Sequence, residues 1–149
     1  MIVILGHEPQ ATDLKEALEE RGFRDITIVE TEEKFRRNLP IYALRPPRIF
    51  ILAIIVRWTD PDHVDKNPVP EEVRIRGFHE AGFRCYRETL NWDSLTRVPV
   101  IFYEELDLED VQPHLDTLQI LPHVRYLERD DSVLPLLELL AEFDVRPRR

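Results

Sequence analysis

The chain has 149 residues, of which 43% are hydrophobic and 33% charged, and its formal net charge is −9 at pH 7. This length and composition suit one packed domain and exclude wholesale disorder. The negative charge disfavours nucleic acid as a partner, because binding to phosphates depends on clustered cations.

Five short apolar runs predict five β-strands. They cover residues 2–5, 26–29, 49–56, 98–103 and 124–127. The first and third runs are continuously apolar, as in strands that helices cover on both faces. The third is the most hydrophobic stretch of the chain, and we expect it to be the middle strand.

Amphipathic segments between these runs predict helices. Thr12 or Asp13 can cap the first helix, and Thr31 can cap the second, which Pro40 should stop. Pro113 must lie in the first turn of a later helix. Three further helices are expected over about residues 78–90, 111–118 and 132–143. The segment 57–77 is polar and rich in proline, and it predicts an enlarged loop.

Strand and helix alternate five times, with connections too long for hairpins, so the strands should be parallel with right-handed crossovers. The sequence therefore predicts a three-layer α/β fold with a five-stranded, doubly wound parallel sheet. We expect one domain over residues 1–144 and a basic tail over 145–149. The lone Cys85 excludes an internal disulfide.

No targeting segment is recognised in the sequence. The chain begins directly with an apolar strand, without a preceding cationic region. No apolar run approaches the roughly 20 residues that span a bilayer. A cytoplasmic protein without membrane contact is expected.

The segments 2–9, 47–54, 99–105 and 124–129 follow one another in the order and context of the characteristic blocks of a response-regulator receiver domain. The chain resembles such a domain over nearly its whole length, and the resemblance implies a flavodoxin-like sheet with the strand order 2-1-3-4-5. In that family the first block ends in two metal-binding acids and the second carries the phosphoacceptor aspartate. The third block ends in Ser or Thr, and the fourth ends in Lys before Pro.

None of these positions holds the family's residue. The acid pair is replaced by Gly6 and His7, the acceptor by Ala53, the hydroxyl by Glu104 and the lysine by Arg129, while Glu8 follows the former pair by one position. Phosphoryl transfer to aspartate needs a carboxylate nucleophile and a cation held by further carboxylates. The resemblance therefore implies a degenerate receiver that signals without phosphorylation, without enzymatic activity and without a cofactor or metal.

The replacements could also compensate one another. If the fourth and fifth strands end at the same level, Glu104 would lie within reach of Arg129 and near the place of a phosphoryl group. A bidentate carboxylate–guanidinium pair there would hold the domain in one state. The alternative is two exposed charges that contribute little.

A protein partner follows from the resemblance, either a signalling component, an output domain or a second copy of the chain in a homodimer. Receivers commonly pair through the face that corresponds here to residues 108–118 and 124–143. Its candidate contact residues are Val111, Leu115, Tyr126 and Leu134. Trp58 is a further candidate anchor, since tryptophan is enriched at interface hot spots; the alternative is that it caps the edge of the core.

Another class of function remains open, a small metal- or ligand-binding enzyme on the same fold that uses the 57–77 loop. His7, Glu8, Asp60, Asp62, His63 and Asp65 would supply its polar groups. The spacing of the loop acids suggests a cation site, but it lacks the glycine and distal glutamate of an EF-hand. A solvated acidic loop is the simpler explanation. A third alternative is a small molecule that replaces phosphate as the signal.

Overall fold

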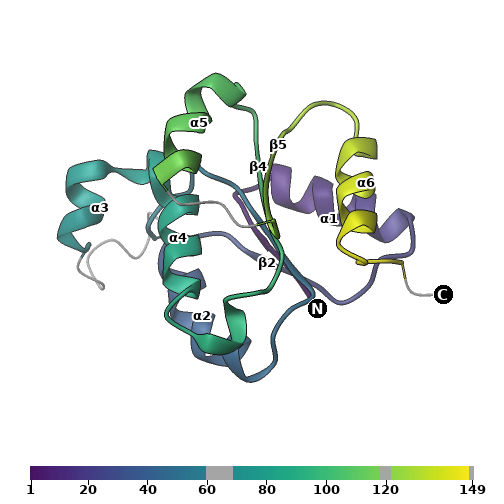
Figure 1. Cartoon of the computed structure of the whole chain (residues 1–149), viewed down its shortest axis with the longest axis horizontal. Coiled ribbons are helices and arrows are strands. Elements are labelled where there is room, and N and C mark those ends of the chain that lie inside the picture. The colour runs from purple at the N-terminus through teal and green to yellow at the C-terminus, as the bar shows by residue number, and fades with distance from the viewer. Residues whose placement is uncertain (60–68, 118–121, 148–149) are drawn as a thin grey trace.

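Five parallel strands form one sheet in the order β2-β1-β3-β4-β5. Helices lie on either side of this sheet (Figure 1). The structure is a computed structural model, and it describes residues 1–59, 69–117 and 122–147. The strands are β1 (Ile2–Leu5), β2 (Ile26–Val29), β3 (Ile49–Leu52), β4 (Val100–Glu104) and β5 (Val124–Glu128). The order and direction of the strands confirm the predicted flavodoxin-like sheet.

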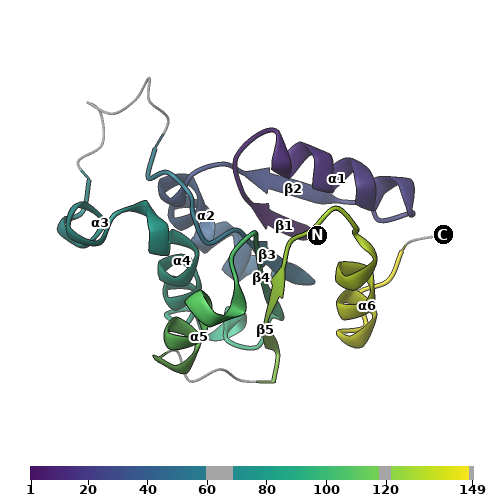
Figure 2. The same cartoon turned by 90° about the horizontal axis from the view of Figure 1, so that it is seen from above.

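Helices cover both faces of this sheet. The α-helices are α1 (Gln10–Glu20), α2 (Glu32–Leu44), α3 (Glu71–Arg76), α4 (Ala81–Thr89), α5 (Leu108–Thr117) and α6 (Leu134–Glu142), and the short 3-10 helices are η2 (Phe78–Glu80) and η3 (Asp93–Leu95). Figure 2 shows α1 and α6 on one side of the sheet and α2, α4 and α5 on the other. None of the helices in the described ranges has the length and apolar character needed to cross a bilayer.

Each strand contributes to two separate cores, because neighbouring side chains of a strand point to opposite faces. In β1, Ile2 and Ile4 belong to the core under α1 and α6, whereas Val3 and Leu5 belong to the core under α2, α4 and α5. All four side chains are at most 2% exposed. The continuous apolar run in the sequence is therefore explained as predicted, because helices bury this strand on both faces.

The third strand is shorter than predicted. It ends at Leu52 rather than at Val56, because the backbone of Ile54 and Val56 bonds to helical residues, although the N–H of Ala53 still donates to the carbonyl of Leu5 in β1. The carbonyl of Ile54 accepts from the N–H of Gly82 at 2.9 Å, and the N–H of Val56 donates to the carbonyl of Phe78 at 3.3 Å. The chain thus leaves the sheet directly after β3.

Prolines interrupt the helices less than predicted. Helix α2 continues past Pro40 to Leu44, with Leu39 and Tyr42 buried on either side of the proline. Pro113 lies inside α5 and not in its first turn. Packing of the buried residues offsets the hydrogen bond that each proline removes.

The enlarged loop and the basic tail also have different bounds from those predicted. Helix α3 forms within the 57–77 segment, where Val73 is 5% exposed and Gly77 ends the helix with a φ of 73°. At the other end of the chain, Val145 is 4% exposed and packs in the core under α1 and α6. The packed core therefore includes Val145, the first residue of the predicted tail.

Candidate functional site

The strand ends place the altered residues at one edge of the sheet. Leu5 of β1 pairs with Leu52 of β3, so Gly6 and Ala53 leave the sheet side by side. A cavity of about 270 Å³ opens at this edge. It is lined in part by Gly6, His7, Ala53, Glu104 and Arg129. Glu8 lines a neighbouring cavity of about 450 Å³. The structure thus brings five of the six predicted positions into one cavity.

Within the described part of the chain, the floor of this cavity has no carboxylate at the ends of β1 and β3. A Cβ atom added to Gly6 would lie 3.8 Å from the Cβ of Ala53, which is ordinary van der Waals contact. His7 beside them is exposed. Glu104 and Glu105, both from the end of β4, are the carboxylates among the residues that line the cavity.

Glu104 turns its carboxylate toward the loop that follows β3. Phe102 pairs with Leu52, so β4 extends two residues beyond β3 and Glu104 stands beside that loop. Its Oε1 accepts the backbone N–H of Ile55 at 2.9 Å, and its Oε2 accepts that of Glu105 at 3.4 Å. Two backbone donors therefore hold this half-buried anion in place.

Arg129 does not pair with Glu104, and the predicted ion pair is wrong. Its Nη2 donates to the carbonyl of Gln10 at 3.0 Å, and its guanidinium lies 5.5 Å from the centre of the Tyr103 ring. In the part of the chain that the structure describes, Glu104 and Arg129 meet only through their backbones, where the N–H of Arg129 donates to the carbonyl of Glu104 at 2.8 Å. The Glu104 carboxylate is already turned toward the loop after β3, so it is not presented to the guanidinium.

Tyr126 of β5 also contacts the end of β4. Its hydroxyl donates to the carbonyl of Glu104 at 3.1 Å and to that of Leu106. Burial raises the pKa of Tyr126 to about 12, against the smaller opposing effect of the Leu106 hydrogen bond. The half-buried side chain thus ties β5 to the segment after Glu104, and its hydroxyl faces inward.

Two of the residues predicted to contact a partner are buried. Val111 is 1% exposed and Leu115 is 6% exposed, so the prediction that they contact a partner is wrong. Their spacing of four residues puts both on the face of α5 that packs against the sheet. Leu134 is 58% exposed at the start of α6. Trp58 is half-buried, with the guanidinium of Arg36 5.4 Å from its ring centre.

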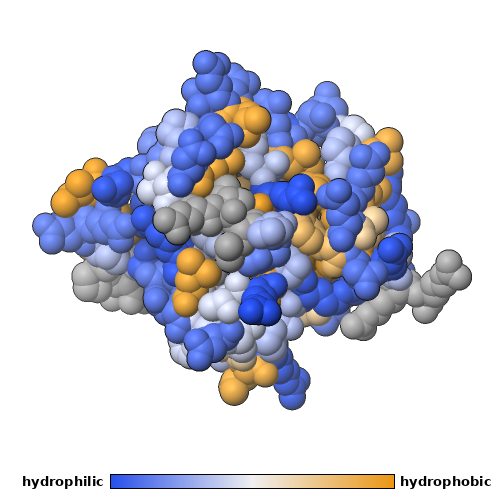
Figure 3. Space-filling view, viewed as in Figure 1, coloured by the Kyte–Doolittle hydropathy of each residue, from blue (hydrophilic) through white to orange (hydrophobic). Residues whose placement is uncertain are grey.

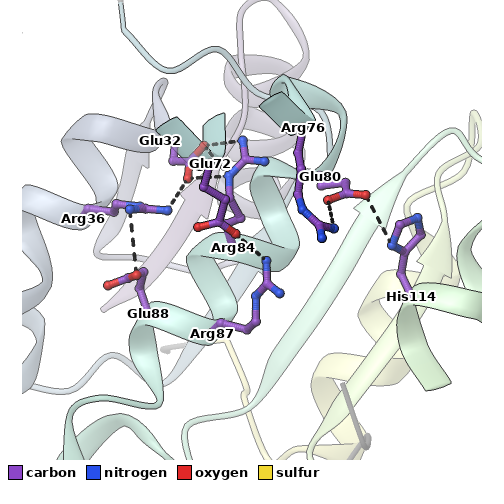
Figure 4. A network of polar contacts seen from close by, with 9 residues as sticks. All are labelled: Glu32, Arg36, Glu72, Arg76, Glu80, Arg84, Arg87, Glu88 and His114. Carbon is purple, nitrogen blue, oxygen red and sulfur yellow. Dashed lines mark hydrogen bonds and ion pairs between the residues drawn. The ribbon is translucent and has the colours of Figure 1, made fainter. Parts of the chain in front are cut away.

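A buried ion pair that the sequence did not predict lies next to the site (Figure 4). Glu32 at the start of α2 and Arg84 of α4 are 0% and 1% exposed. The Arg84 Nη2 lies 2.8 Å from Glu32 Oε1, and its Nε lies 2.9 Å from Oε2. Arg36 brings a second guanidinium to within 2.8 Å of the same carboxylate. Burial lowers the pKa of Arg84, but the hydrogen bonds and charge of Glu32 more than offset this, so the pKa is raised.

The helices that this pair joins also hold the loop after β3. The carbonyl of Arg57 accepts from the N–H of Glu32, and that of Trp58 accepts from the N–H of Glu33, both at 2.9 Å. The N–H of Gly82, two residues before Arg84, donates to the carbonyl of Ile54. The same loop presents the N–H of Ile55 to the carboxylate of Glu104. The ion pair therefore helps to position the donor of that hydrogen bond.

No cluster of metal-ligating side chains is found within residues 1–59, 69–117 and 122–147. Asp60, Asp62, His63 and Asp65, which the sequence offered as cation ligands, lie outside the described residues, as do Leu118 and the last two arginines.

Comparison with known proteins identifies the fold. No protein-family model matches the chain, and no curated protein matches its sequence. One similar solved structure is the receiver domain of the sensor histidine kinase PA1611 from Pseudomonas aeruginosa PAO1, with magnesium in its active-site cleft. The TM-score is 0.65 at 17% identity, over 95% of this chain and 94% of that one. The phosphorylated cyanobacterial phytochrome response regulator RcpA gives a TM-score of 0.59 at 14% identity, over 96% of this chain and 90% of that one. The chain has the fold of a response-regulator receiver domain.

Proposed function

We propose that the chain is a receiver-like signalling domain of the two-component type, which works in the cytoplasm without phosphorylation and acts by binding another protein. The observation that carries this proposal is that, among the residues the structure describes, Gly6, His7 and Ala53 stand where β1 and β3 end, and none of them has a carboxylate. Of the two similar structures, one holds magnesium in its active-site cleft and the other is phosphorylated. At the corresponding edge of this sheet, Gly6 and Ala53 have no side-chain oxygen for a cation or a phosphoryl group.

The carboxylate of Glu104 takes the place of a transferred phosphoryl group in this proposal. It is an anion at the edge where the altered residues meet, and the N–H groups of Ile55 and Glu105 hold it. Hydrogen bonds to an ionised acceptor are stronger than those between neutral groups. Since this anion is part of the chain, no kinase is needed to install it, and the domain stays in one state.

Beryllofluoride with magnesium tests the loss of phosphorylation, because the complex binds an acceptor aspartate as a phosphoryl mimic. We expect neither a heat of binding nor a shift of Tm for the natural chain. A receiver with an intact acceptor aspartate is the positive control for the assay. A magnesium-dependent shift in the natural chain would contradict the proposal.

A restored variant makes the same experiment sharper. It carries the five replacements Gly6→Asp, His7→Asp, Ala53→Asp, Glu104→Thr and Arg129→Lys. We expect beryllofluoride and magnesium to raise the Tm of this variant, because it regains the nucleophile and the cation ligands. A variant with only Glu104→Thr and Arg129→Lys should stay inert, which separates the carboxylates from the other changes.

We propose α6 as the surface for a partner, with a second copy of the chain as its first candidate. Apolar surface is visible over α6 at the right of the view in Figure 3, and separate apolar patches stand out elsewhere on this mostly hydrophilic face. Leu134 at the start of α6 is 58% exposed, and Leu137 and Leu139 are partly exposed beside it. Burial of a leucine side chain contributes about 1.5–3 kcal/mol, which makes Leu134 a natural anchor.

Sedimentation of the Leu134→Glu variant tests this surface. A charge at the centre of an apolar contact should shift the chain toward the monomer without changing the unfolding free energy of the monomer itself. Leu44→Glu is the matched control, because Leu44 is 85% exposed at the end of α2, on the other side of the sheet. A natural chain that sediments as a monomer, or equal effects of both variants, would exclude α6 as a dimer contact.

A further inference from the structure

The cavity at the altered site lies where the fold favours a ligand. It opens at the carboxyl ends of β1 and β3, the two strands between which the order of the sheet reverses. In open α/β sheets, ligands bind in the crevice at this switch point. Its volume of about 270 Å³ falls just below the range of roughly 300–1,000 Å³ for larger ligands. A molecule of the size of a small metabolite would fill it.

One part of the cavity lining is apolar. Leu5, Leu14 and Ile51 line it, and each is at most 5% exposed. The two smallest residues of the floor, Gly6 and Ala53, leave the space that acidic side chains would otherwise occupy. Apolar lining of this kind binds an apolar body by removing its surface from water.

The polar residues that line the cavity carry both signs of charge. Arg129 uses its Nη2 to hold the carbonyl of Gln10 at 3.0 Å, and a guanidinium has five N–H donors in all. Glu104 accepts two backbone N–H groups, whereas a carboxylate offers about four acceptor positions. Glu105 adds a second carboxylate. Donors and acceptors thus remain for a molecule inside the cavity.

We propose that this cavity binds a small zwitterion with an apolar body, the chemistry of an apolar α-amino acid. The carboxylate of the amino acid pairs with Arg129, its ammonium pairs with Glu104 and Glu105, and its side chain packs on the apolar floor. This inference goes beyond the proposed signalling role, since it assigns a ligand to the site.

Ligands with a single charge fit the same cavity less well. A simple carboxylate would be repelled by the two glutamates and by the net charge of −9. A simple amine would leave the guanidinium of Arg129 without an anionic partner. A zwitterion is neutral overall and satisfies both kinds of charge.

Titration with L-leucine, followed by the backbone amide signals of Gly6, Ile55 and Arg129, tests the proposal. The matched analogues are 4-methylpentanoate, which lacks the ammonium, and 3-methylbutylamine, which lacks the carboxylate. We expect saturable shifts with leucine and dissociation constants at least about tenfold weaker with either analogue, the loss expected for one missing charged contact. L-valine and L-phenylalanine extend the test to other side-chain volumes.

Variants of the cavity separate specific binding from surface effects. Arg129→Gln should remove the leucine shifts by deleting the cation, and Ala53→Leu should remove them by filling the cavity. Arg125→Gln is the control, because the Arg125 guanidinium lies over the ring of Phe143, 5.9 Å from its centre, and does not line the cavity. A thermal melt of each variant shows that it is folded.

The proposal is overturned if none of the three amino acids shifts these amides, or if an analogue with one charge binds as tightly as leucine. Leucine binding that survives both Arg129→Gln and Ala53→Leu would likewise overturn it. The beryllofluoride result does not depend on any of these outcomes, so the two proposals fail separately.

Discussion

Gly82 lies so close to Ala53 that a Cβ atom on Gly82 would stand 2.2 Å from the Ala53 carbonyl oxygen and 2.8 Å from the Cα of Ile54. Helix α4 therefore begins in direct contact with the backbone that leaves β3. Only glycine allows this approach, because the atoms it meets belong to backbone and cannot rotate away. The contact aligns the N–H of Gly82 with the carbonyl of Ile54 and fixes the loop beside Glu104.

The Gly82→Ala variant should be destabilised by about 1–3 kcal/mol or more, the range for forcing an extra carbon into a packed site. Urea denaturation measures the change. Gly6→Ala is the control, because its Cβ would find only ordinary contacts at 3.7 and 3.8 Å. We expect that variant to gain about 0.4–1 kcal/mol from the stiffer unfolded chain. Equal effects of the two substitutions would contradict the close contact.

Removing Glu32 should lower the unfolding free energy more than removing Arg84. Glu32→Leu leaves Arg84 buried without an anion and takes the partner from Arg36, so a loss of about 3–5 kcal/mol is expected. Arg84→Met costs less, because Glu32 keeps Arg36 at 2.8 Å. The double variant Glu32→Leu with Arg84→Met should recover much of the loss, since no unpaired charge stays fully buried. Denaturation of the four proteins as a double-mutant cycle measures this coupling, and simple additivity would refute it.

Glu104→Ala should destabilise the chain by about 1–3 kcal/mol, because it leaves the N–H of Ile55 without its acceptor. Glu104→Gln should cost less, since its amide oxygen still accepts the bond without the charge. Hydrogen exchange of the Ile55 amide should quicken in the same order. Glu105→Ala is the exposed control and should stay within about 0.5 kcal/mol of the natural chain. An Ile55 amide that exchanges equally slowly in all three variants would contradict the contact.

All four tyrosines of the chain should lose their phenolic protons at a higher pH than a tyrosine in water. Burial is the main cause that raises the pKa of Tyr42, Tyr86, Tyr103 and Tyr126, the last to about 12. The folded chain therefore keeps phenolic protons that the unfolded chain loses near pH 10. Stability is fully present below that pH and falls as the pH rises toward 12. The phenolate absorbance of the native protein should appear at higher pH than in urea, and Tyr126→Phe should remove the component near 12. If the phenolate absorbance rose at the same pH in the native protein and in urea, the predicted effect of burial on the tyrosines would be refuted.

The parallel direction of the strands could be predicted from local features of the sequence, whereas the order 2-1-3-4-5 came from the resemblance to a receiver domain. Apolar runs alternate with helical patterns, and parallel connections have a fixed hand. The same reasoning placed Gly6, Ala53, Glu104 and Arg129 at one edge, since the carboxyl ends of parallel strands meet there. It could not give the direction of the Glu104 side chain, which depends on β4 extending two residues beyond β3.

Some buried residues carry a local signal in the sequence, but the sequence does not show what they pack against. Val111 and Leu115 are four residues apart on α5, and this spacing is the usual signal for a face that packs inward. Arg84 also carried a signal, because it stands within an apolar run, Ala81-Gly82-Phe83-Arg84-Cys85-Tyr86. Its partner Glu32 lies 52 residues away and reads locally as a favourable first-turn acid. Only the packing of α2 against α4 joins the two.

The ion pair between α2 and α4 gives this side of the molecule its own response to heating. The hydration of charged groups has a strongly negative entropy. The free-energy cost of removing Glu32 and Arg84 from water therefore decreases as the temperature rises. Apolar contacts gain no such relief, because their stabilisation per unit area plateaus. On warming, the helices that hold the Ile55 loop should loosen later than α1 and α6, which rest on the opposite face.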